Sequence, residues 1–585
     1  MPTGWRAGPR DAARGAEFGA WLSALFTAPS AGAMVGGSLG MLLHAGFDWG
    51  SLMGLIVFAG RWAGIALTWG VLFAVPAGAV AWLYRGIARR LGRPEPDQPT
   101  RRRRRRRRWG VAGALGLVGL VAGAVAGNYL IRTSIRSAEE AVAETDAIDP
   151  DWRLDDLLAA RDEVPDEENS ALVAAAAVAL LDESWPPEAL EGEPGPDVRE
   201  ILGEAATLGE FDDSRRLDDA SLAAIVASLE EQAEALELAR TLADYDRGRH
   251  EYEIGPAVID TLLPETQNVR GVARLLNADV IVAAHDGGPD DALASCRAMI
   301  AAGRSIGDEP FAIGQLVRIA IGSTASRAAR RALGLGEPSD QALAALQDLA
   351  LDERHQPRVR WGLRGERAIL AEIIRRIAEG EMPISALSEG GAASATPGGG
   401  VSGMLVAGGW YQYAVALRWC NELIAILDLP EHEWPAAVAR WDARNQSVKN
   451  SRLGMATSTL PLLLMPAVSA FITAEMRIRA DLGSLVVLLA AERHRRATGR
   501  WPASAEEIGP EILPAPPLDP YTGEPFRVAH VDGRLRVYSL GPNLEDEGGA
   551  YDPRKAAEAH VEDDVGTYAY DPELRGRPAV EEEAP

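Results

Sequence analysis

The stretch RRRRRRRRWGVAGALGLVGLVAGAVAGNYLI, Arg101–Ile131, places eight consecutive arginines directly before 23 uncharged residues. A helix needs about 20 mainly apolar residues to cross the hydrocarbon core of a bilayer. The sequence therefore predicts a transmembrane helix near 109–131 with a strongly cationic segment at its amino-terminal end.

Two further apolar runs precede the arginines and extend this prediction. The run near 62–84 is equally long and has aromatic residues at both ends, which suits the two membrane–water interfaces. The run near 30–59 is apolar apart from His44 and Asp48. We expect a transmembrane region over 1–131 with about three helices.

The arginines set the expected orientation. The segment 85–108 holds 12 arginines against Glu95 and Asp97, and three more arginines lie in the first 14 residues. Loops rich in Lys and Arg stay cytoplasmic. We therefore expect a multi-pass protein of the inner (cytoplasmic) membrane, with 85–108 as an Arg-rich cytoplasmic loop and the C-terminal domains extracytoplasmic.

The charge is divided unequally between the two parts of the chain. Residues 1–131 carry 16 arginines against 5 acidic residues, so the net charge of −25 leaves −36 on the other 454 residues. An acidic body repels phosphate backbones. No aromatic residues interleave the arginines as a base-stacking platform would require. We expect membrane lipids as partners and no nucleic acid.

Small residues recur along one face of the expected third helix, at Gly119, Gly123 and Gly127. Such spacing lets two helices approach closely. We expect this face to pack on the first two spans, on a second copy of the chain or on another envelope protein.

The remaining sequence predicts a mainly α-helical extracytoplasmic domain over 151–455, reached through a polar linker at 132–150. Two short helices are expected between 151 and 181. From about 218 to 380, apolar residues follow i, i+3, i+4 spacing, and Gly–Pro punctuation such as GGPD at 287–290 separates the helices. No motif repeats at a fixed interval, so we expect an irregular array of helical hairpins.

A Gly-rich segment within 388–409 predicts a flexible loop, and aromatic residues crowd after it. These aromatic residues are Trp410, Tyr411, Tyr413, Trp419, Trp434 and Trp441. One interpretation is a lidded cleft for a glycan or peptide. The other is that the rings fill the core between two amphipathic helices.

Signatures of catalysis and of cofactor binding are weak or missing. Cys296 and Cys420 are too few for a cysteine-based zinc site. We expect a buried free thiol at Cys296, with a bridge to Cys420 as the alternative. A GxSxG match at 36–40 falls in an apolar membrane run instead of a strand-to-helix turn. Acidic residues are plentiful but no pair is marked as an acid/base couple, so we assign no catalytic or cofactor-binding residue.

The C-terminal section carries the most specific pattern. A helix ends at TGRWP (498–502), the turn LDPYTGEPF (518–526) follows, and the runs FRVAHV and LRVYSL are joined by Asp532-Gly533, which is typical of a β-hairpin. The strand pair ends in VYSLGP, and the acidic loop EDEGG comes next. In this order, the motifs resemble the periplasmic head of type II secretion system protein G, the major pseudopilin, over about 456–572. The preceding section, with DWRLDDLLAAR and VPDEENSA, is similar to uncharacterised bacterial membrane-anchored proteins that carry the same C-terminal module.

The resemblance implies a small pseudopilin-like α+β domain at 456–572, beyond which we expect a disordered tail at 573–585. It also implies a calcium ion held in the acidic loop, since hard oxygen ligands suit calcium. Carried over by position, the candidate ligands are the carbonyls of Leu540 and Gly541 and the carboxylates of Asp546 and Asp564, with Glu545 or Asp563 as further candidates. The alternative is a solvated acidic loop that binds no metal.

One departure from the family bears on function. Pseudopilins begin with a short leader and cleavage site, whereas the corresponding region here, Leu453–Glu475, is internal and lacks that motif. Incorporation into a pseudopilus is therefore in doubt. The uncharged part of this region could form a fourth span, but Pro461 and Pro466 favour a helix buried against the array.

The leading expectation is a membrane-anchored cell-envelope protein with a non-enzymatic interaction or scaffold role. A hydrolase of envelope glycans or peptides that uses a carboxylate pair near the aromatic cluster is the second hypothesis. A component associated with a secretion system is the third.

Overall fold

The structure, a computed structural model, is mostly helical in its described part and contains one small sheet. It describes residues 98–182, 185–186, 198, 212–251, 264–382, 408–549 and 564–579. The chain divides into two compact units, Met1–Glu140 with Ile377–Ala414, and Ala141–Arg376 with Val415–Pro585. The predicted spans near 30–59 and 62–84 lie outside the described residues, as does the predicted loop at 388–409 except for its last two residues.

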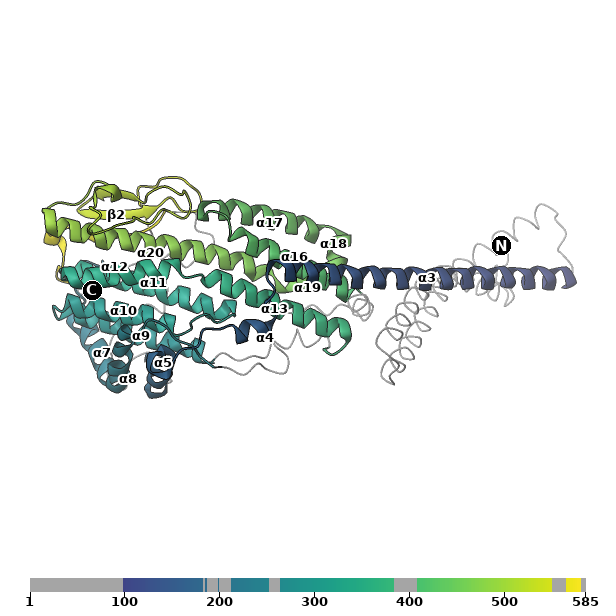
Figure 1. The fold of residues 1–585 in the computed structure, drawn as a ribbon, viewed down its shortest axis with the longest axis horizontal. Helices are drawn as coiled ribbons and strands as arrows, with labels where there is room; N and C mark the ends of the chain where they lie inside the picture. Colours follow the sequence, from purple (N-terminus) through teal and green to yellow (C-terminus); the bar gives the residue numbers. More distant parts are fainter. Residues whose placement is uncertain are drawn as a thin grey trace, which may run out of the picture. The chain divides into compact units, whose positions relative to one another are not determined.

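The octa-arginine segment and the apolar segment after it form one helix, α3, over Gln98–Ile148 (Figure 1). The described part of the expected Arg-rich loop is thus helical, and so is nearly all of the expected linker at 132–150. Arg, Ala, Leu and Glu are good helix formers, and no proline interrupts the chain between Pro99 and Pro150. Pro99 lies in the first turn, where its missing N–H costs nothing, and Pro150 disfavours continuation of the helix.

Within α3, residues Leu117–Ile148 are long and apolar enough to cross a membrane, by length and composition. Large apolar side chains on this part of the helix are exposed, among them Val118, Val121 and Val125. In the described part of the chain, no other helix meets the same test. Of the three expected spans, the structure therefore supports a candidate only for the third.

The described chain after α3 is mainly helical, as expected. In chain order its helices are α4 (Leu154–Ala159), α5 (Ser170–Leu180), α7 (Asp219–Glu230), α8 (Ala233–Arg240), α9 (Pro264–His285), α10 (Pro289–Arg304), α11 (Ala312–Leu335), α12 (Asp340–His355), α13 (Arg358–Glu379), α16 (Gly409–Ile426), α17 (Trp434–Asn450), α18 (Arg452–Thr457), α19 (Thr459–Leu464) and α20 (Pro466–Thr498). Of these, α9, α10 and α11 pack consecutively on one another. Short 3-10 turns are η1 (Asp166–Glu168), η3 (Thr241–Asp244), η5 (Glu431–Glu433), η6 (Ala505–Glu507) and η8 (Pro572–Leu574).

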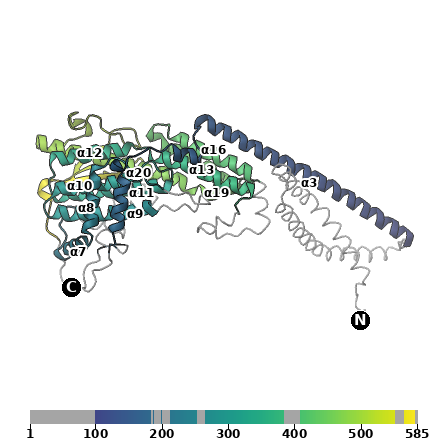
Figure 2. The ribbon, with the colours of Figure 1, turned by 60° about the horizontal axis from the view of Figure 1, so that its bottom comes forward.

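Glycine and proline separate these helices where the sequence predicts. α9 ends at His285, Gly287 takes a positive φ of 79°, and Pro289 opens α10. Figures 1 and 2 show α9, α10, α11 and α12 side by side, and α10 packs on the other three. Leucines such as Leu276, Leu293 and Leu333 are fully buried between them.

The uncharged region 453–474 forms α18, α19 and the first turns of α20. The prolines break it, as expected, because neither Pro461 nor Pro466 can donate an intrahelical hydrogen bond. Met465 and Phe471 are buried in the same core cluster as the array helices. The structure therefore agrees with a buried helix here and gives no candidate span.

α20 joins the array to the small sheet. It packs against α11 and α12 and also against strands β2 and β3, and it ends at Gly499, which takes the left-handed φ of 82°. The predicted boundary at 455–456 therefore falls inside one compact unit. Because α20 supplies apolar residues both to the helical array and to the small sheet, the array and the sheet share a single core.

The sheet is antiparallel in the order β1-β2-β3, with β1 at Arg527–Val531, β2 at Arg534–Ser539 and β3 at Val565–Tyr570. The predicted hairpin is confirmed, since Asp532 and Gly533 both take positive φ and Val531 pairs with Arg534. Sequence analysis missed β3. Its residues are nearly all buried, so the strand lacks the alternation of a half-exposed strand.

The segment expected to be a disordered tail, 573–585, is ordered where the structure describes it, up to residue 579. Arg575 bonds to Glu492 on α20, and Arg577 bonds to Asp212 and Ser214. These long-range contacts join the tail to the array. The composition of the tail by itself cannot reveal partners so far away in the chain. Residues 580–585 lie outside the described part.

Candidate functional site

The acidic loop after β2 contains two of the carboxylates expected to hold calcium. Asp564 lies directly before β3 and is only 2% exposed. Its Oδ2 atom accepts hydrogen bonds from the backbone N–H groups of Glu547 at 3.1 Å and Gly549 at 2.8 Å. Its Oδ1 atom is buried without a hydrogen-bond partner. A buried carboxylate oxygen without a partner is costly, and a cation would relieve that cost.

Like charges surround this carboxylate. Burial, and then the negative charges of Glu547 and Asp546, raise the pKa of Asp564 to about 6. Asp546 accepts hydrogen bonds at Oδ1 from the Tyr538 hydroxyl at 3.0 Å and from the Gly548 N–H at 2.9 Å. The loop thus gathers three acids, and the charges of Asp546 and Glu547 favour the neutral form of Asp564.

The two expected carbonyl ligands come from a turn that Asp519 organises. Asp519 accepts hydrogen bonds from the Ser539 hydroxyl at 2.6 Å and from the Leu540 N–H at 3.3 Å. The Ser539 hydroxyl in turn accepts from the Gly541 N–H, and Gly541 takes a positive φ of 64°. Asp519 itself belongs to the LDPYTGEPF motif, so that motif fixes the path of the chain into the acidic loop.

The oxygen-rich donor set matches calcium in its chemistry. In the part of the chain that the structure describes, however, no three His, Cys, Asp or Glu side chains lie close enough together to hold a metal ion. A calcium ion here would therefore need the carbonyls of Leu540 and Gly541 beside Asp546 and Asp564. Calcium binding remains a prediction. Sequence analysis named Glu545 and Asp563 as further candidates but missed Glu547; Asp563 lies outside the described residues.

Among the aromatic residues expected to form one cluster, two separate pairs of rings are in contact. Trp419 on α16 and Trp441 on α17 meet edge to face, with ring centroids 6.0 Å apart. Trp410 meets Tyr413 at 5.8 Å instead. Trp434 is buried and donates from Nε1 to the Leu429 carbonyl at 2.9 Å. The Trp419–Trp441 pair lines a hollow, and Asp442 is the single carboxylate among the described residues of its lining.

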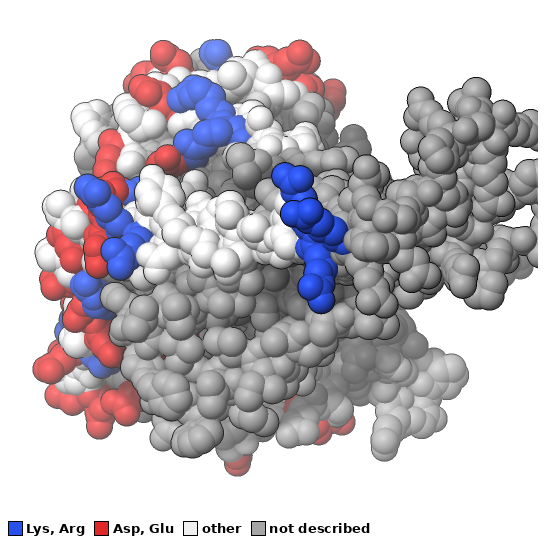
Figure 3. Space-filling view, turned by 90° about the vertical axis from the view of Figure 1, so that its right-hand side faces the viewer, with Lys and Arg blue, Asp and Glu red and all other residues white. Residues whose placement is uncertain are grey.

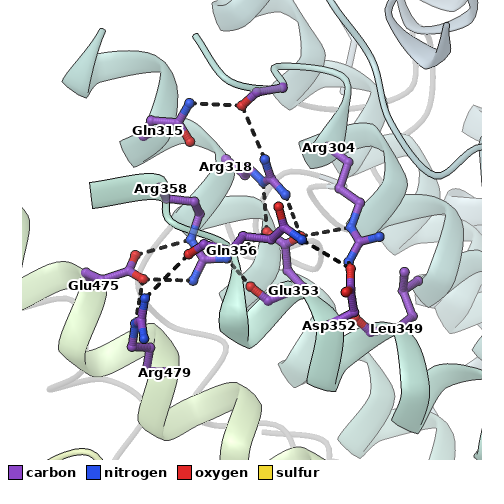
Figure 4. Close-up of polar contacts among 11 residues, drawn as sticks. Arg304, Gln315, Arg318, Leu349, Asp352, Glu353, Gln356, Arg358, Glu475 and Arg479 are labelled. Carbon is purple, nitrogen blue, oxygen red and sulfur yellow. Dashed lines mark hydrogen bonds and ion pairs between the residues drawn. The ribbon is translucent and has the colours of Figure 1, made fainter. Parts of the chain in front are cut away.

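Two buried glutamates, Glu353 and Glu475, belong to an ion network that sequence analysis did not foresee (Figure 4). Glu353 on α12 accepts hydrogen bonds from Arg304, Arg318 and Arg358 at 2.6–2.8 Å. Arg358 also bonds to Glu475 on α20 at 3.1 and 3.2 Å. Arg358 and Glu475 are 117 residues apart in the chain, so no local pattern could indicate their pairing.

The arginines hold these acids in the charged form. Burial alone would raise the pKa of Glu353, but the charges of Arg318 and Arg358 and the bond from Arg318 lower it to about 2. A carboxylate that is closed to solvent and fixed as an anion cannot deliver a proton near neutral pH. The network therefore braces α10, α11, α12, α13 and α20 and does not suit acid/base chemistry.

The two thiols are equally unsuited to chemistry. Cys296 and Cys420 are free and buried, so the alternative of a bridge between them is wrong. Burial raises the pKa of both thiols, that of Cys420 to about 12. Thiolate nucleophiles require the opposite shift. The GxSxG match at 36–40 lies outside the described residues.

Comparison with known proteins adds no identification. No protein-family model, no curated protein and no solved structure matches this chain.

Proposed function

We propose that this chain is a membrane-anchored protein of the cell envelope whose acidic, extracytoplasmic body serves as a non-enzymatic scaffold for a partner. The observation that carries the proposal is α3, a single helix in which eight arginines directly precede an apolar segment with exposed side chains. Arginines at one end of such a segment are costly to translocate, so they fix its orientation.

The exposure pattern of α3 supports an anchor over a core helix. Leu117, Val118 and Val125 are each more than 60% exposed. Water-exposed aliphatic side chains in such a row are unfavourable, whereas lipid would cover them. Gly123 and Gly127, on the same helix, are buried.

The buried ion pairs support a scaffold over an enzyme. Glu353, Glu475 and Glu492 are almost fully buried, and each accepts hydrogen bonds from at least two arginines. We propose that such pairs fix the relative positions of the helices that carry them, so that the body has one defined arrangement. On the face drawn in Figure 3, acidic side chains are interspersed with basic ones along one edge of the described surface.

Two other roles are kept as alternatives, each with its own observation. Asp442 lies at the rim of the Trp419–Trp441 hollow, where partial burial raises its pKa, which would suit a general acid in a hydrolase. A second carboxylate would still be needed beside it. The resemblance of 456–572 to a pseudopilin head favours a component of a secretion system. Turnover of an envelope polymer that is lost on Asp442→Asn would support the first alternative, and co-purification with secretion components would support the second.

Protease accessibility tests the anchor and its orientation. Protease added to intact spheroplasts should digest the protein to a membrane-protected fragment, and a periplasm-active reporter fused after Pro585 should be active. Replacement of Arg101–Arg108 by eight glutamines should weaken the orientation signal. A fraction of the protein should then insert in the opposite orientation and stay full-length, because its body is shielded from the protease. The matched control replaces Arg132 and Arg136, at the other end of the apolar segment, and should stay fully digested. Survival of the wild-type full-length band, while an external control protein is digested, would contradict the proposal.

A further inference from the structure

A hollow of about 440 Å³ opens between α16, α17, α19 and the start of α20. Its size falls in the usual range for small-molecule sites. All of its lining residues belong to one compact unit of the chain, so the hollow does not depend on how the membrane-anchoring unit is placed. The scaffold role proposed above makes no use of it.

Aromatic rings form one part of the hollow. Trp419 is half-buried and Trp441 is almost fully buried, and their planes meet at 78°. Pro461, Leu462 and Met465 supply an apolar wall from the α19–α20 segment. A ligand in this space must therefore present apolar C–H groups to the rings and to this wall.

Three buried polar atoms beside the rings have no partner. They are Nε1 of Trp441 and both polar atoms of the Asn445 side chain, which is only 7% exposed. More than nine in ten buried polar groups in folded proteins are hydrogen-bonded, so three buried atoms without a partner on residues that line one hollow call for an explanation. Trp434 on the same helix has its Nε1 bonded to a carbonyl, which shows that α17 can satisfy a buried tryptophan.

Helical spacing aligns these groups along the hollow. Trp441, Asn445 and Lys449 follow one another at intervals of four residues on α17 and so form one ridge. Asp442 and Gln446 stand on the next ridge, are exposed, and lie at the rim. The rim thus offers one anion, one cation and one amide, and its net charge is zero.

The chemistry of the ligand follows from this arrangement. An aliphatic ligand would leave the Asn445 amide unpaired, and a phosphate would face the Asp442 carboxylate. A sugar ring has a face of C–H groups for the tryptophans and an edge of hydroxyls, each of which can donate and accept. The Asn445 amide offers a donor and an acceptor side by side, which match two neighbouring hydroxyls.

We propose that this hollow is a binding site for a neutral carbohydrate, whose ring packs on Trp419 and whose hydroxyls bond to Asn445 and to Nε1 of Trp441. Asp442, Gln446 and Lys449 contact further hydroxyls at the rim. The site binds the sugar without cleaving it, because the described lining residues include a single carboxylate. This inference goes beyond the scaffold role and does not rest on it.

Calorimetry on the full chain in detergent micelles tests the site, with cellobiose, maltose and N,N′-diacetylchitobiose as probes. At least one disaccharide should bind saturably with a Kd of about 0.1–1 mM, and Trp fluorescence should change on binding. Asn445→Leu should weaken this binding at least about tenfold, because both amide hydrogen bonds are lost. The same variant should unfold at an unchanged or higher temperature, since it removes two buried groups that have no partner in the free protein.

Matched variants separate a binding role from a structural one. Trp441→Phe should weaken sugar binding and leave stability nearly unchanged, whereas Trp434→Phe should lower stability and leave affinity unchanged. Asn421, which bonds to Thr145 and Arg367, serves as the amide control. Asn421→Leu should destabilise the protein without loss of affinity.

Three outcomes would overturn the proposal. One is the absence of saturable binding of all three disaccharides at up to about 10 mM. Another is binding that neither Asn445→Leu nor Trp441→Phe weakens. The third is saturable binding of a tetra-alanine peptide in the absence of any sugar binding, which would assign the hollow to peptides.

Discussion

Two glutamates on neighbouring helices offer a sharp test of the buried ion network. Glu353 on α12 and Glu372 on α13 both have a pKa lowered to about 2. The arginines that lower the pKa differ between the two glutamates, and so does the exposure of the two side chains to water. Glu353 is buried among Arg304, Arg318 and Arg358, whereas Glu372 is partly exposed and bonds to arginines three and four residues later on its own helix. Although the two pKa values are equal, we therefore expect the two glutamates to contribute unequally to the free energy of unfolding.

The expected magnitude for Glu353→Gln follows from two independent routes. Lowering a carboxyl pKa from 4.5 to about 2 corresponds to roughly 3 kcal/mol in favour of the folded, charged form. Removing one partner from a buried ion pair costs about 3–5 kcal/mol, because the remaining charges lose their counterion. We expect Glu353→Gln to lower the free energy of unfolding by about 3 kcal/mol or more. For Glu372→Gln, solvent screening limits the expected loss to below about 1 kcal/mol.

The pH dependence of the free energy of unfolding provides a second test of the stabilising effect of Glu353. The folded-state pKa of Glu353 is depressed, so its contribution is fully present above the unfolded-state value of 4.5 and is lost as the pH falls towards 2. Urea titrations of the full chain in detergent, followed by Trp fluorescence, measure the free energies. The gap between wild type and Glu353→Gln should be widest near neutral pH and should narrow below about pH 4.5. A cost for Glu353→Gln no larger than that for Glu372→Gln would refute the reasoning.

Four further predictions concern the C-terminal sheet region and the thiols. Asp564 has a raised folded-state pKa of about 6, so the metal-free protein should melt higher as the pH falls from about 7 to about 5, and Asp564→Asn should abolish that rise. If calcium binds in the acidic loop, chelation should lower the melting temperature of the wild type but not of this variant, whereas an equal effect on both would place any calcium elsewhere. Arg575→Ala should lower the free energy of unfolding by about 3 kcal/mol, because buried Glu492 loses one of its two arginine partners, and a loss below about 1 kcal/mol would contradict this. Neither Cys296 nor Cys420 should react with a maleimide until the protein is unfolded, and rapid labelling of either thiol in the native protein would show that it is accessible.

Local chemistry made a large part of the architecture readable from the sequence. Helical spacing predicted the array, Gly–Pro punctuation predicted its breaks, and Asp532-Gly533 predicted the hairpin, because each of these signals depends on residues within a few positions of one another. The same holds for the apolar part of α3, whereas the continuation of this helix through the arginines and the expected linker was not predicted. Prediction failed where a segment looks unstructured in isolation but is held by distant partners, as at Arg575 and Arg577.

Sequence alone determined that this chain is mainly helical, that an apolar segment follows eight arginines, and that an acidic body comes after it. Only the tertiary structure decided which charges meet. With so many arginines and acids in the chain, composition is compatible with many pairings, and the packing of α12 and α13 on α20 selects Arg358 as the link between Glu353 and Glu475. The hollow at Trp441 and Asn445 arises in the same way, because it exists only where α16, α17 and the start of α20 leave space between them.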